Sequence, residues 1–402
     1  YFLFMFSNRK HVFGLFFYLK KLSSYIVFFA MNLGGGGAER VLVDLSNLLE
    51  GKYSKEYSIT VCTIFSGALD NQLNNRINFV RLFNRDFSKR RSIVNKIFFK
   101  ILCLGKGKVL RKLIDFKLKE KFDLEIAFLE GFPAKMVAIS ENKNTRKIGW
   151  IHANLKELDY TAKFFNSTEH EVATYNELDR LVFVSDECSK GYISAFGEGH
   201  RRTQVIKNIV NYNRINRLAQ EKNIFEFPYI CSIGRLSDEK GFDRLIEAYR
   251  NLKLQKKIVN LKLIIVGSGK KEKELKNLIK EYNLQDDVIL IPFSENPYKI
   301  LSNCEFFISS SRTEGYPLVV VEALVLKKPV MVTETGAATV VGEGEYGLVV
   351  ENSTRGIERG IVELLNEKSK FHEKATKGSI RVKAENEEKM NEIVSLFNNC
   401  LK

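Results

Sequence analysis

Residues 309–324 read SSSRTEGYPLVVVEAL, and this stretch decides the fold class of the chain. A short apolar run from Phe306 to Ile308 precedes it, which is typical of a buried parallel strand. Gly315 then interrupts the apolar pattern, and Pro317 stands where the first turn of a helix tolerates its missing N–H group. The stretch therefore predicts a strand, a glycine-containing loop and a helix, a geometry that favours an anion at the helix N-terminus.

Two carboxylates flank this turn, Glu314 in the loop and Glu322 inside the helix. A carboxylate beside an anion site is useful when the ligand also carries hydroxyl groups, as a nucleotide sugar does. The alternative interpretation places Glu314 on a solvated loop and Glu322 on the surface of the helix. The residues of this stretch, taken alone, leave both interpretations open.

The stretch resembles the signature of the retaining glycosyltransferases of family 4, which have the GT-B fold. In that signature two glutamates enclose seven residues that include glycine and proline, and the second glutamate begins Glu-Ala-Leu, as Glu322 does here. Three further motif regions match in order, so the resemblance covers about residues 25–400. It implies an α/β protein of two doubly wound Rossmann-like domains that face one another across a cleft.

The length of 402 residues is consistent with two domains. The resemblance implies an acceptor-side domain over residues 25–211 and a nucleotide-sugar-binding domain over residues 212–385. A terminal helix is expected over residues 383–402, and its part over 386–402 is expected to cross back to the first domain. Residues 1–24 are either a segment upstream of the true domain or one that rests on a membrane. Charged residues interrupt their apolar runs well short of the ~20 residues that a spanning helix needs.

The net charge is +15 and the isoelectric point is about 9.3. Such an excess points to an anionic partner: nucleic acid, anionic lipid or a phosphorylated substrate. Nucleic acid is disfavoured because no motif combines basic and aromatic residues in a recognised pattern. The six cysteines are scattered and form no CxxC pair, which argues against a zinc or disulfide framework and fits a reducing cytoplasm.

A glycine run, Gly34 to Gly37, follows an apolar strand predicted over Tyr25 to Ala30. Helical periodicity begins directly after it, so a ligand is able to approach the backbone at a helix N-terminus. The run matches neither the Rossmann fingerprint nor the Walker loop. The order GG-A-E-R resembles the first loop of family 4, and the resemblance places Gly36 and Gly37 near the donor diphosphate and the acceptor.

His152 ends a short strand predicted over Lys147 to His152. Ligands collect at the carboxyl ends of such strands, although a single histidine is also a common capping or core residue. The resemblance implies that His152 contacts the transferred sugar. Leu181 to Ser185 is expected to be the last strand of this domain.

Two cations, Arg235 and Lys240, follow a strand predicted over Tyr229 to Ile233. Arginine offers a planar fork and lysine a point charge, and both suit a diphosphate, whereas the alternative is a surface ion pair. The pattern Gly-Arg-Leu…Lys-Gly resembles family 4. Residues 331–343 are expected to form a loop of small residues.

The resemblance assigns further donor contacts to loops that follow predicted strands. These residues are Gly267, Gly269, Phe293, Gly315, Tyr316, Pro317 and Leu318.

The resemblance also implies a role for each principal side chain. Arg235 and Lys240 would neutralise the leaving diphosphate, which is electrostatic catalysis. Glu322 would hold the ribose, Glu314 would hold the donor sugar, and His152 would contact that sugar from the opposite domain. No carboxylate nucleophile is marked on the other face of the sugar, and the resemblance implies attack from the leaving-group face.

The segment over residues 85–121 alternates basic residues with bulky apolar ones. A basic helix with an apolar stripe predicts a helix that lies on an anionic membrane, and the alternative is an ordinary core helix with a solvated basic face. The expected membrane-binding residues are Arg90, Arg91, Lys96 and Lys100, and Arg111 belongs to the same basic series.

These observations predict a retaining glycosyltransferase that works at the inner face of the plasma membrane as a peripheral cytoplasmic protein. It would move a sugar from a nucleoside-diphosphate sugar, for which a UDP-sugar is favoured, to a lipid-linked saccharide or polysaccharide acceptor in bacterial cell-surface polysaccharide biosynthesis. No metal and no other cofactor are expected. The alternatives are a GT-B epimerase or hydrolase and a nonenzymatic membrane-bound sugar-nucleotide binder.

Overall fold

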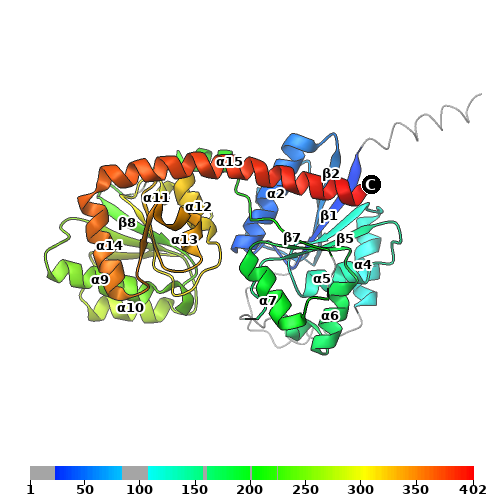
Figure 1. The fold of residues 1–402 in the computed structure, drawn as a ribbon, viewed down its shortest axis with the longest axis horizontal. Coiled ribbons are helices and arrows are strands. Elements are labelled where there is room, and N and C mark those ends of the chain that lie inside the picture. The colour runs from blue at the N-terminus through cyan, green and yellow to red at the C-terminus, as the bar shows by residue number, and fades with distance from the viewer. Residues whose placement is uncertain (1–22, 84–106, 157–160, 200–201, 224) are drawn as a thin grey trace, which may run out of the picture. The chain divides into compact units, whose positions relative to one another are not determined.

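The computed structural model describes residues 23–83, 107–156, 161–199, 202–223 and 225–402. The chain divides into two compact units, each built on its own sheet (Figure 1). The first unit comprises the chain up to Lys207 together with Asn391–Lys402, and the second comprises Asn208–Met390. The sequence placed this division near residue 211.

The first unit contains a seven-stranded parallel sheet in the order β3-β2-β1-β4-β5-β6-β7. Its central strands are continuous apolar runs because helices cover both faces of such a sheet. A short strand, β7, follows β6, so the expectation that the strand near residues 181–185 is the last one was wrong. Its sequence, Thr-Gln-Val, is too short and polar to carry a strand pattern. The strands are β1 Ser24–Ala30, β2 Tyr57–Phe65, β3 Asn78–Phe83, β4 Leu124–Ala127, β5 Arg146–Ile151, β6 Arg180–Phe183 and β7 Thr203–Val205.

Helices connect these parallel strands, as crossovers in a parallel sheet require. Helices α6 and α7 begin where the hydroxyls of Ser167 and Ser185 accept hydrogen bonds from backbone N–H groups in the first turn. The described helices of the unit are α2 Gly37–Tyr53, η1 Asp70–Gln72, α4 Lys108–Leu118, α5 Phe132–Ala138, η2 Ala162–Phe164, α6 Thr168–Asn176 and α7 Asp186–Phe196.

Arg111 on α4 is buried, which corrects the expectation that it belongs to a membrane-facing basic surface. Its guanidinium forms ion pairs with Glu125 of β4 at 2.7 Å and with Asp115 at 2.8 Å. Arg111 faces inward because Glu125, which is itself buried, requires a cationic partner. The ion pair between Arg111 and Glu125 therefore holds α4 against the sheet.

The second unit contains a six-stranded parallel sheet in the order β10-β9-β8-β11-β12-β13. Successive residues of one strand pack on opposite faces, so Phe307 belongs to one core cluster and Ile308 to the other. The sheet is therefore doubly wound, as predicted. The strands are β8 Tyr229–Ile233, β9 Lys262–Val266, β10 Val288–Ile291, β11 Phe307–Ser309, β12 Val330–Thr333 and β13 Leu348–Val350.

Helices cover both faces of this sheet (Figure 1). Residues 331–343, expected to form a loop, instead contain most of β12, all of α13 and the start of η4, because small residues pack well in a buried helix. The described helices are α8 Tyr212–Ala219, η3 Asp238–Lys240, α9 Phe242–Leu254, α10 Glu272–Glu281, α11 Tyr298–Leu301, α12 Leu318–Val325, α13 Ala337–Val340, η4 Gly342–Gly344 and α14 Thr354–Asn366.

The terminal helix α15 spans Lys368–Leu401 and begins well before residue 383, where the sequence placed its start. Its last turns belong to the first unit. There Phe397 lies 6.3 Å from Phe28 and 5.9 Å from Tyr57, measured between ring centroids, and the Tyr57 hydroxyl donates to Asn398 at 2.8 Å. The end of the chain thus packs beside strands β1 and β2.

Candidate active site

The loops after β8, β9 and β10 form one connected edge of the second sheet. The Leu236 N–H donates to the Ser268 carbonyl at 3.1 Å, and the Lys271 N–H donates to the Leu236 carbonyl at 3.0 Å. The Phe293 N–H donates to the Ser268 hydroxyl at 2.9 Å. These bonds bring Phe293 and the Gly267–Gly269 turn next to the loop that carries Arg235.

The loop after β11 is tied to the same edge. The Arg312 N–H donates to the Glu239 carbonyl at 2.7 Å, and the Ser310 hydroxyl donates to the Lys240 carbonyl at 3.0 Å. On its other side, the Gly336 N–H donates to the Glu314 carbonyl at 2.9 Å. The loops that the sequence singled out in this unit therefore meet at the carboxyl ends of the strands.

Two glycines permit this close packing. Gly241 has a φ of +62°, and a Cβ at this position would stand 2.3 Å from the Ser310 carbonyl oxygen. Gly267 has a φ of +157°, and its Cβ would stand 1.9 Å from the Gly234 carbonyl oxygen. Any other residue would push the neighbouring loops apart, because both obstacles are backbone atoms.

Lys240 and Glu314 form an ion pair in this structure. The carboxylate of Glu314 also accepts a hydrogen bond from the Ser311 hydroxyl at 2.8 Å. Both side chains are partly buried, whereas Arg235 is exposed and has no hydrogen-bond or ion-pair partner for its side chain among the described residues. A strong anion would therefore find one available cation, Arg235, and one that already has a carboxylate partner, Lys240.

Helix α12 begins beside this ion pair. Pro317 is its N-cap, with an extended ψ of 113°, and lies one position before the first helical residue. The first N–H groups of the helix lack partners within it, and the space around the Gly315 Cα is open. Tyr316 packs against Lys389 of α15, whose Nζ lies 5.5 Å from the tyrosine ring centroid. The N-terminus of α12 thus points its dipole at the edge where the loops meet.

Glu322 is held by residues that sequence reasoning missed. The buried Tyr298 hydroxyl donates to Glu322 Oε1 at 2.8 Å, and Arg214 donates to that hydroxyl at 3.1 Å. Tyr298 comes from α11 and Arg214 from α8, so no local spacing links either of them to Glu322. The chain of bonds fixes the carboxylate on the first turns of α12.

In the first unit, the glycine loop and His152 follow neighbouring strands. Strand β4 pairs with β1 on one side and with β5 on the other, all in parallel. Gly36 is the N-cap of α2, with no side-chain hydrogen bond at this cap. His152 directly follows β5, as predicted, and both sites therefore lie at the carboxyl edge of this sheet.

Glu130, which sequence reasoning also missed, lies between them. Its Oε2 accepts a hydrogen bond from the His152 backbone N–H at 2.8 Å. Burial raises the pKa of the Glu130 carboxyl to about 7, although hydrogen bonds from backbone N–H groups oppose that rise, and the charges of Glu39 and Glu171 raise the pKa further. The available signal was its place just after a buried strand, the same criterion that selected His152.

The His152 imidazole is neutral at neutral pH because burial lowers its pKa to about 3. The ring lies against Phe128, with 4.9 Å between centroids. Its two nitrogens, like Glu130 Oε1, are buried and lack a hydrogen-bond partner among the described residues. Glu130 Oε1 and the two ring nitrogens of His152 are therefore available to form hydrogen bonds with one ligand.

The expected membrane-binding residues Arg90, Arg91, Lys96 and Lys100 fall outside the described residues. None of the helices in the described ranges combines the length and the apolar composition needed to cross a bilayer. Within those ranges we also find no group of three or more histidine, cysteine, aspartate or glutamate side chains placed to hold a metal ion.

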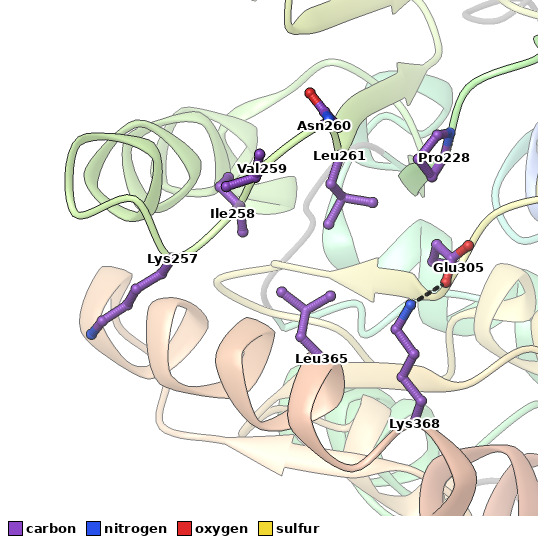
Figure 2. A pocket seen from close by; sticks show the side chains of 9 residues that line it. All are labelled: Pro228, Lys257, Ile258, Val259, Asn260, Leu261, Glu305, Leu365 and Lys368. Carbon is purple, nitrogen blue, oxygen red and sulfur yellow. Dashed lines mark hydrogen bonds and ion pairs between the residues drawn. The ribbon is translucent and has the colours of Figure 1, made fainter.

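A hollow of about 280 Å³ opens at the opposite, amino edge of the second sheet (Figure 2). Pro228, Leu261 and Glu305, which line it, precede strands β8, β9 and β11. Glu305 forms an ion pair with Lys368 there at 2.7 Å. None of the predicted site residues lines this hollow.

Comparison with known proteins shows similarity to glycosyltransferases. Residues 215–381 match the family model described as glycosyl transferases group 1. The chain is 29% identical to the N-acetylgalactosamine-N,N'-diacetylbacillosaminyl-diphospho-undecaprenol 4-alpha-N-acetylgalactosaminyltransferase of Campylobacter jejuni, over 80% of this chain and 85% of that protein. It is 23% identical to the amylovoran biosynthesis glycosyltransferase AmsD of Erwinia amylovora, over 77% of this chain and 81% of that protein.

Solved structures show the same fold. HepE of Anabaena, determined in complex with UDP and glucose, superposes with a TM-score of 0.69 at 19% identity, over 92% of this chain and 99% of that chain. Sucrose-phosphate synthase of Thermosynechococcus elongatus superposes with a TM-score of 0.71 at 17% identity, over 94% of this chain and 98% of that chain. The two parallel sheets and the solved structures show the GT-B fold. With residues 215–381 matching glycosyl transferases group 1 and with relatives named as glycosyltransferases, the chain is a glycosyltransferase of this fold.

Proposed function

We propose that this enzyme transfers a sugar from a nucleoside-diphosphate sugar to a lipid-linked saccharide or polysaccharide acceptor, with retention of anomeric configuration, in the biosynthesis of a bacterial surface glycan. The observation that carries the proposal is the Lys240–Glu314 ion pair at the N-terminus of α12. A cation and a helix dipole suit the diphosphate, and the carboxylate suits the sugar hydroxyls.

The diphosphate is bound by Arg235, Lys240 and the first N–H groups of α12. These groups are preorganised by the bonds among the loops, so they stabilise the charge that develops on the leaving group without a large rearrangement. Lys240 exchanges its Glu314 partner for the phosphate when the donor binds. Gly267, Gly269 and Phe293 lie along the edge that accommodates the rest of the nucleotide.

The nucleotide is a UDP-sugar, which is supported by the HepE complex with UDP and glucose, a protein of the same fold. Glu322 binds the ribose hydroxyls, and the hydrogen bond from the Tyr298 hydroxyl holds its carboxylate in position. Glu314 binds the hydroxyls of the donor sugar.

Transfer proceeds with retention by attack from the face that the diphosphate leaves. Arg235, Lys240 and the dipole of α12 neutralise the diphosphate, so the proposal requires neither a metal ion nor another cofactor. His152 contacts a sugar, and the neutral state of its ring suits a hydrogen bond to an uncharged hydroxyl.

The acceptor is presented at the inner face of the plasma membrane, where the protein is peripheral. The relative from Campylobacter jejuni is named for an undecaprenol-linked saccharide. On α4 of this chain, Phe116 is 77% exposed and Leu113 is 37% exposed, with Lys112 exposed beside them. An apolar face with adjacent lysines fits an anionic membrane surface.

Residues 90–100 extend the basic series toward α4 in the chain. We assign the membrane contact to Arg90, Arg91, Lys96 and Lys100, together with the exposed face of α4.

Two alternative functions would use the same donor site: a GT-B epimerase or hydrolase, and a nonenzymatic sugar-nucleotide binder.

The test is incubation of the protein with five donors, namely UDP-glucose, UDP-galactose, UDP-N-acetylglucosamine, UDP-N-acetylgalactosamine and GDP-mannose, with and without bacterial lipid-linked saccharides. We expect a glycosylated lipid whose new linkage keeps the donor's α configuration by NMR, in excess chelator. Free sugar or an epimerised donor as the sole product supports the first alternative, and an unchanged donor that binds supports the second.

A further inference from the structure

Three buried polar atoms at the carboxyl edge of the first sheet have no hydrogen-bond partner within the described part of the chain. Glu130 is 3% exposed, and its Oε1 has no hydrogen-bond partner among the residues that the structure describes. The same holds for both ring nitrogens of His152. Native proteins seldom leave such atoms unpaired, so three of them in adjoining residues indicate a place that a polar ligand fills.

The protein fixes the positions of these groups while leaving them open. The His152 N–H holds the Glu130 carboxylate through Oε2 at 2.8 Å, and Phe128 supports the imidazole ring. The Tyr175 hydroxyl accepts a hydrogen bond from the Gly131 N–H at 3.1 Å and so holds the start of α5 next to Glu130. These contacts fix the positions of the side chains and leave their hydrogen-bonding atoms without partners. Such an arrangement is typical of a binding site.

The donor and acceptor pattern identifies the kind of ligand. An ionised carboxylate only accepts hydrogen bonds, whereas a neutral imidazole donates one and accepts one. A hydroxyl group complements this pair, because it donates to the carboxylate and accepts from the ring N–H. A phosphate does not, because it would place a second anion against Glu130.

We propose that Glu130 Oε1 and the His152 imidazole form one hydroxyl-binding site, and that its ligand is a hydroxyl group of the donor sugar or of the acceptor saccharide. The assignment of Glu130 rests on the proposed function of the chain as a transferase. It makes Glu130 a substrate-binding residue of the first unit, in addition to a support for His152.

The site is sensitive to pH in a defined direction. The pKa of the Glu130 carboxyl is raised to about 7, so the ionised form that accepts from a hydroxyl is gained as pH rises through that value. The titratable groups that face it are Glu39 from α2, Glu171 and Tyr175 from α6, and His152 after β5. Glu39 and Glu171 are anionic and disfavour ionisation, and the neutral His152 does not compensate for them.

The test uses the full chain as wild type, Glu130→Gln and Glu130→Ala, with Glu171→Gln as the matched control. Glutamine keeps an oxygen that accepts from the His152 N–H, so Glu130→Gln should fold as the wild type does. Glu171 is a buried carboxylate in the same unit whose oxygen accepts from the Tyr175 hydroxyl at 3.3 Å. Its charge raises the pKa of Glu130, so Glu171→Gln should move the rise in rate to lower pH and keep Oε1 of Glu130. Thermal unfolding checks all four proteins.

The readouts are transfer to the lipid-linked acceptor and acceptor-free hydrolysis of the UDP-sugar, each as kcat/KM across about pH 5.5 to 8.5. We expect wild-type transfer to rise with pH through about 7 and Glu130→Gln to lose both that rise and about 10- to 100-fold of the rate, the fold-change of one hydrogen bond to a charged group. If the hydroxyl belongs to the donor sugar, hydrolysis falls in parallel with transfer. If it belongs to the acceptor, only transfer falls.

A Glu130→Gln variant with wild-type rates and an unchanged pH profile overturns the inference, and so does a Glu171→Gln control that shows the same losses as Glu130→Gln. Failure of the wild type to transfer any sugar contradicts the proposed function instead. In that case calorimetric binding of the UDP-sugar and of a saccharide acceptor analogue decides the inference, which predicts weaker binding of one of the two to Glu130→Gln.

Discussion

Lys240 and Glu314 are ion-paired, although they are 74 residues apart in the chain and follow different strands. Each is the residue that we assign to a different part of the donor, the lysine to the diphosphate and the glutamate to the sugar. The pair therefore keeps the cation and the carboxylate in place while no donor is bound. Because of this ion pair, removing either residue leaves the other without its oppositely charged partner.

The first prediction concerns the two cations of this loop. Arg235→Ala and Lys240→Ala should each lower kcat about 10²- to 10³-fold, because each removes a group that stabilises the leaving diphosphate. Lys271→Ala is the matched control, since Lys271 lies in the same unit and pairs with Asp238 and Glu274 instead. Steady-state kinetics measures the effect. A Lys240→Ala enzyme as active as the Lys271→Ala control would exclude Lys240 from the donor site.

The second prediction concerns Tyr298. Tyr298→Phe removes the hydroxyl that holds Glu322, so binding of UDP should weaken about 10-fold while kcat changes little. Tyr249→Phe is the control, because Tyr249 is an equally buried tyrosine of the same unit whose hydroxyl donates to the Leu261 carbonyl at 2.6 Å. Calorimetry with UDP decides. Equal losses in both variants would show that the effect is one of general packing.

The third prediction concerns the membrane. Vesicles that contain anionic lipid should bind the protein and release it at high salt, because each basic residue near such a surface contributes only about 1 kcal/mol and is screened. Charge reversal to glutamate at Arg90, Arg91, Lys96 and Lys100 together should abolish the binding. Co-sedimentation measures it, and UDP binding should persist.

Its control reverses the same number of charges on the second unit, at the exposed residues Lys256, Lys257, Lys273 and Lys280. That variant should stay on the vesicles. If both variants are released equally, net charge and not a membrane-binding segment explains the association.

Most of the fold was open to prediction because its signals are local. The apolar run of β8 and the start of α9 at Phe242 follow directly from hydrophobic patterning and from a glycine at the break. Strand β7 could not be predicted, since three residues carry no periodicity. The extra length of α15 escaped prediction because its polar, charged first turns resemble a loop in composition.

Sequence reasoning selected candidate site residues where they directly follow a strand or belong to a recognised motif. His152 was selected by its place at the end of a strand, and Lys240 and Glu322 by their motifs. Tyr298 and Arg214 could not be selected in either way, because their relation to Glu322 is created by the packing of separate helices. The ion pair of Lys240 with Glu314 was equally hidden, since each residue was assigned a role by itself.

The last prediction separates the two glutamates. We assign Glu322 to the ribose, which does not change during the reaction, so Glu322→Gln should weaken the binding of the donor and of free UDP alike. This is uniform binding, and it raises KM more than it lowers kcat. We assign Glu314 to the donor sugar, whose ring gains positive charge as the diphosphate leaves, so Glu314→Gln should lower kcat.

The ion pair sharpens the prediction for Glu314. Glu314→Gln removes the carboxylate that Lys240 must leave before it binds phosphate, so the affinity for free UDP should stay equal or increase. Calorimetry with UDP and steady-state kinetics on both variants give the answer. A Glu314→Gln enzyme that loses UDP affinity while Glu322→Gln keeps it would show that the two roles are reversed, because free UDP carries the ribose and the diphosphate but no sugar for Glu314 to bind.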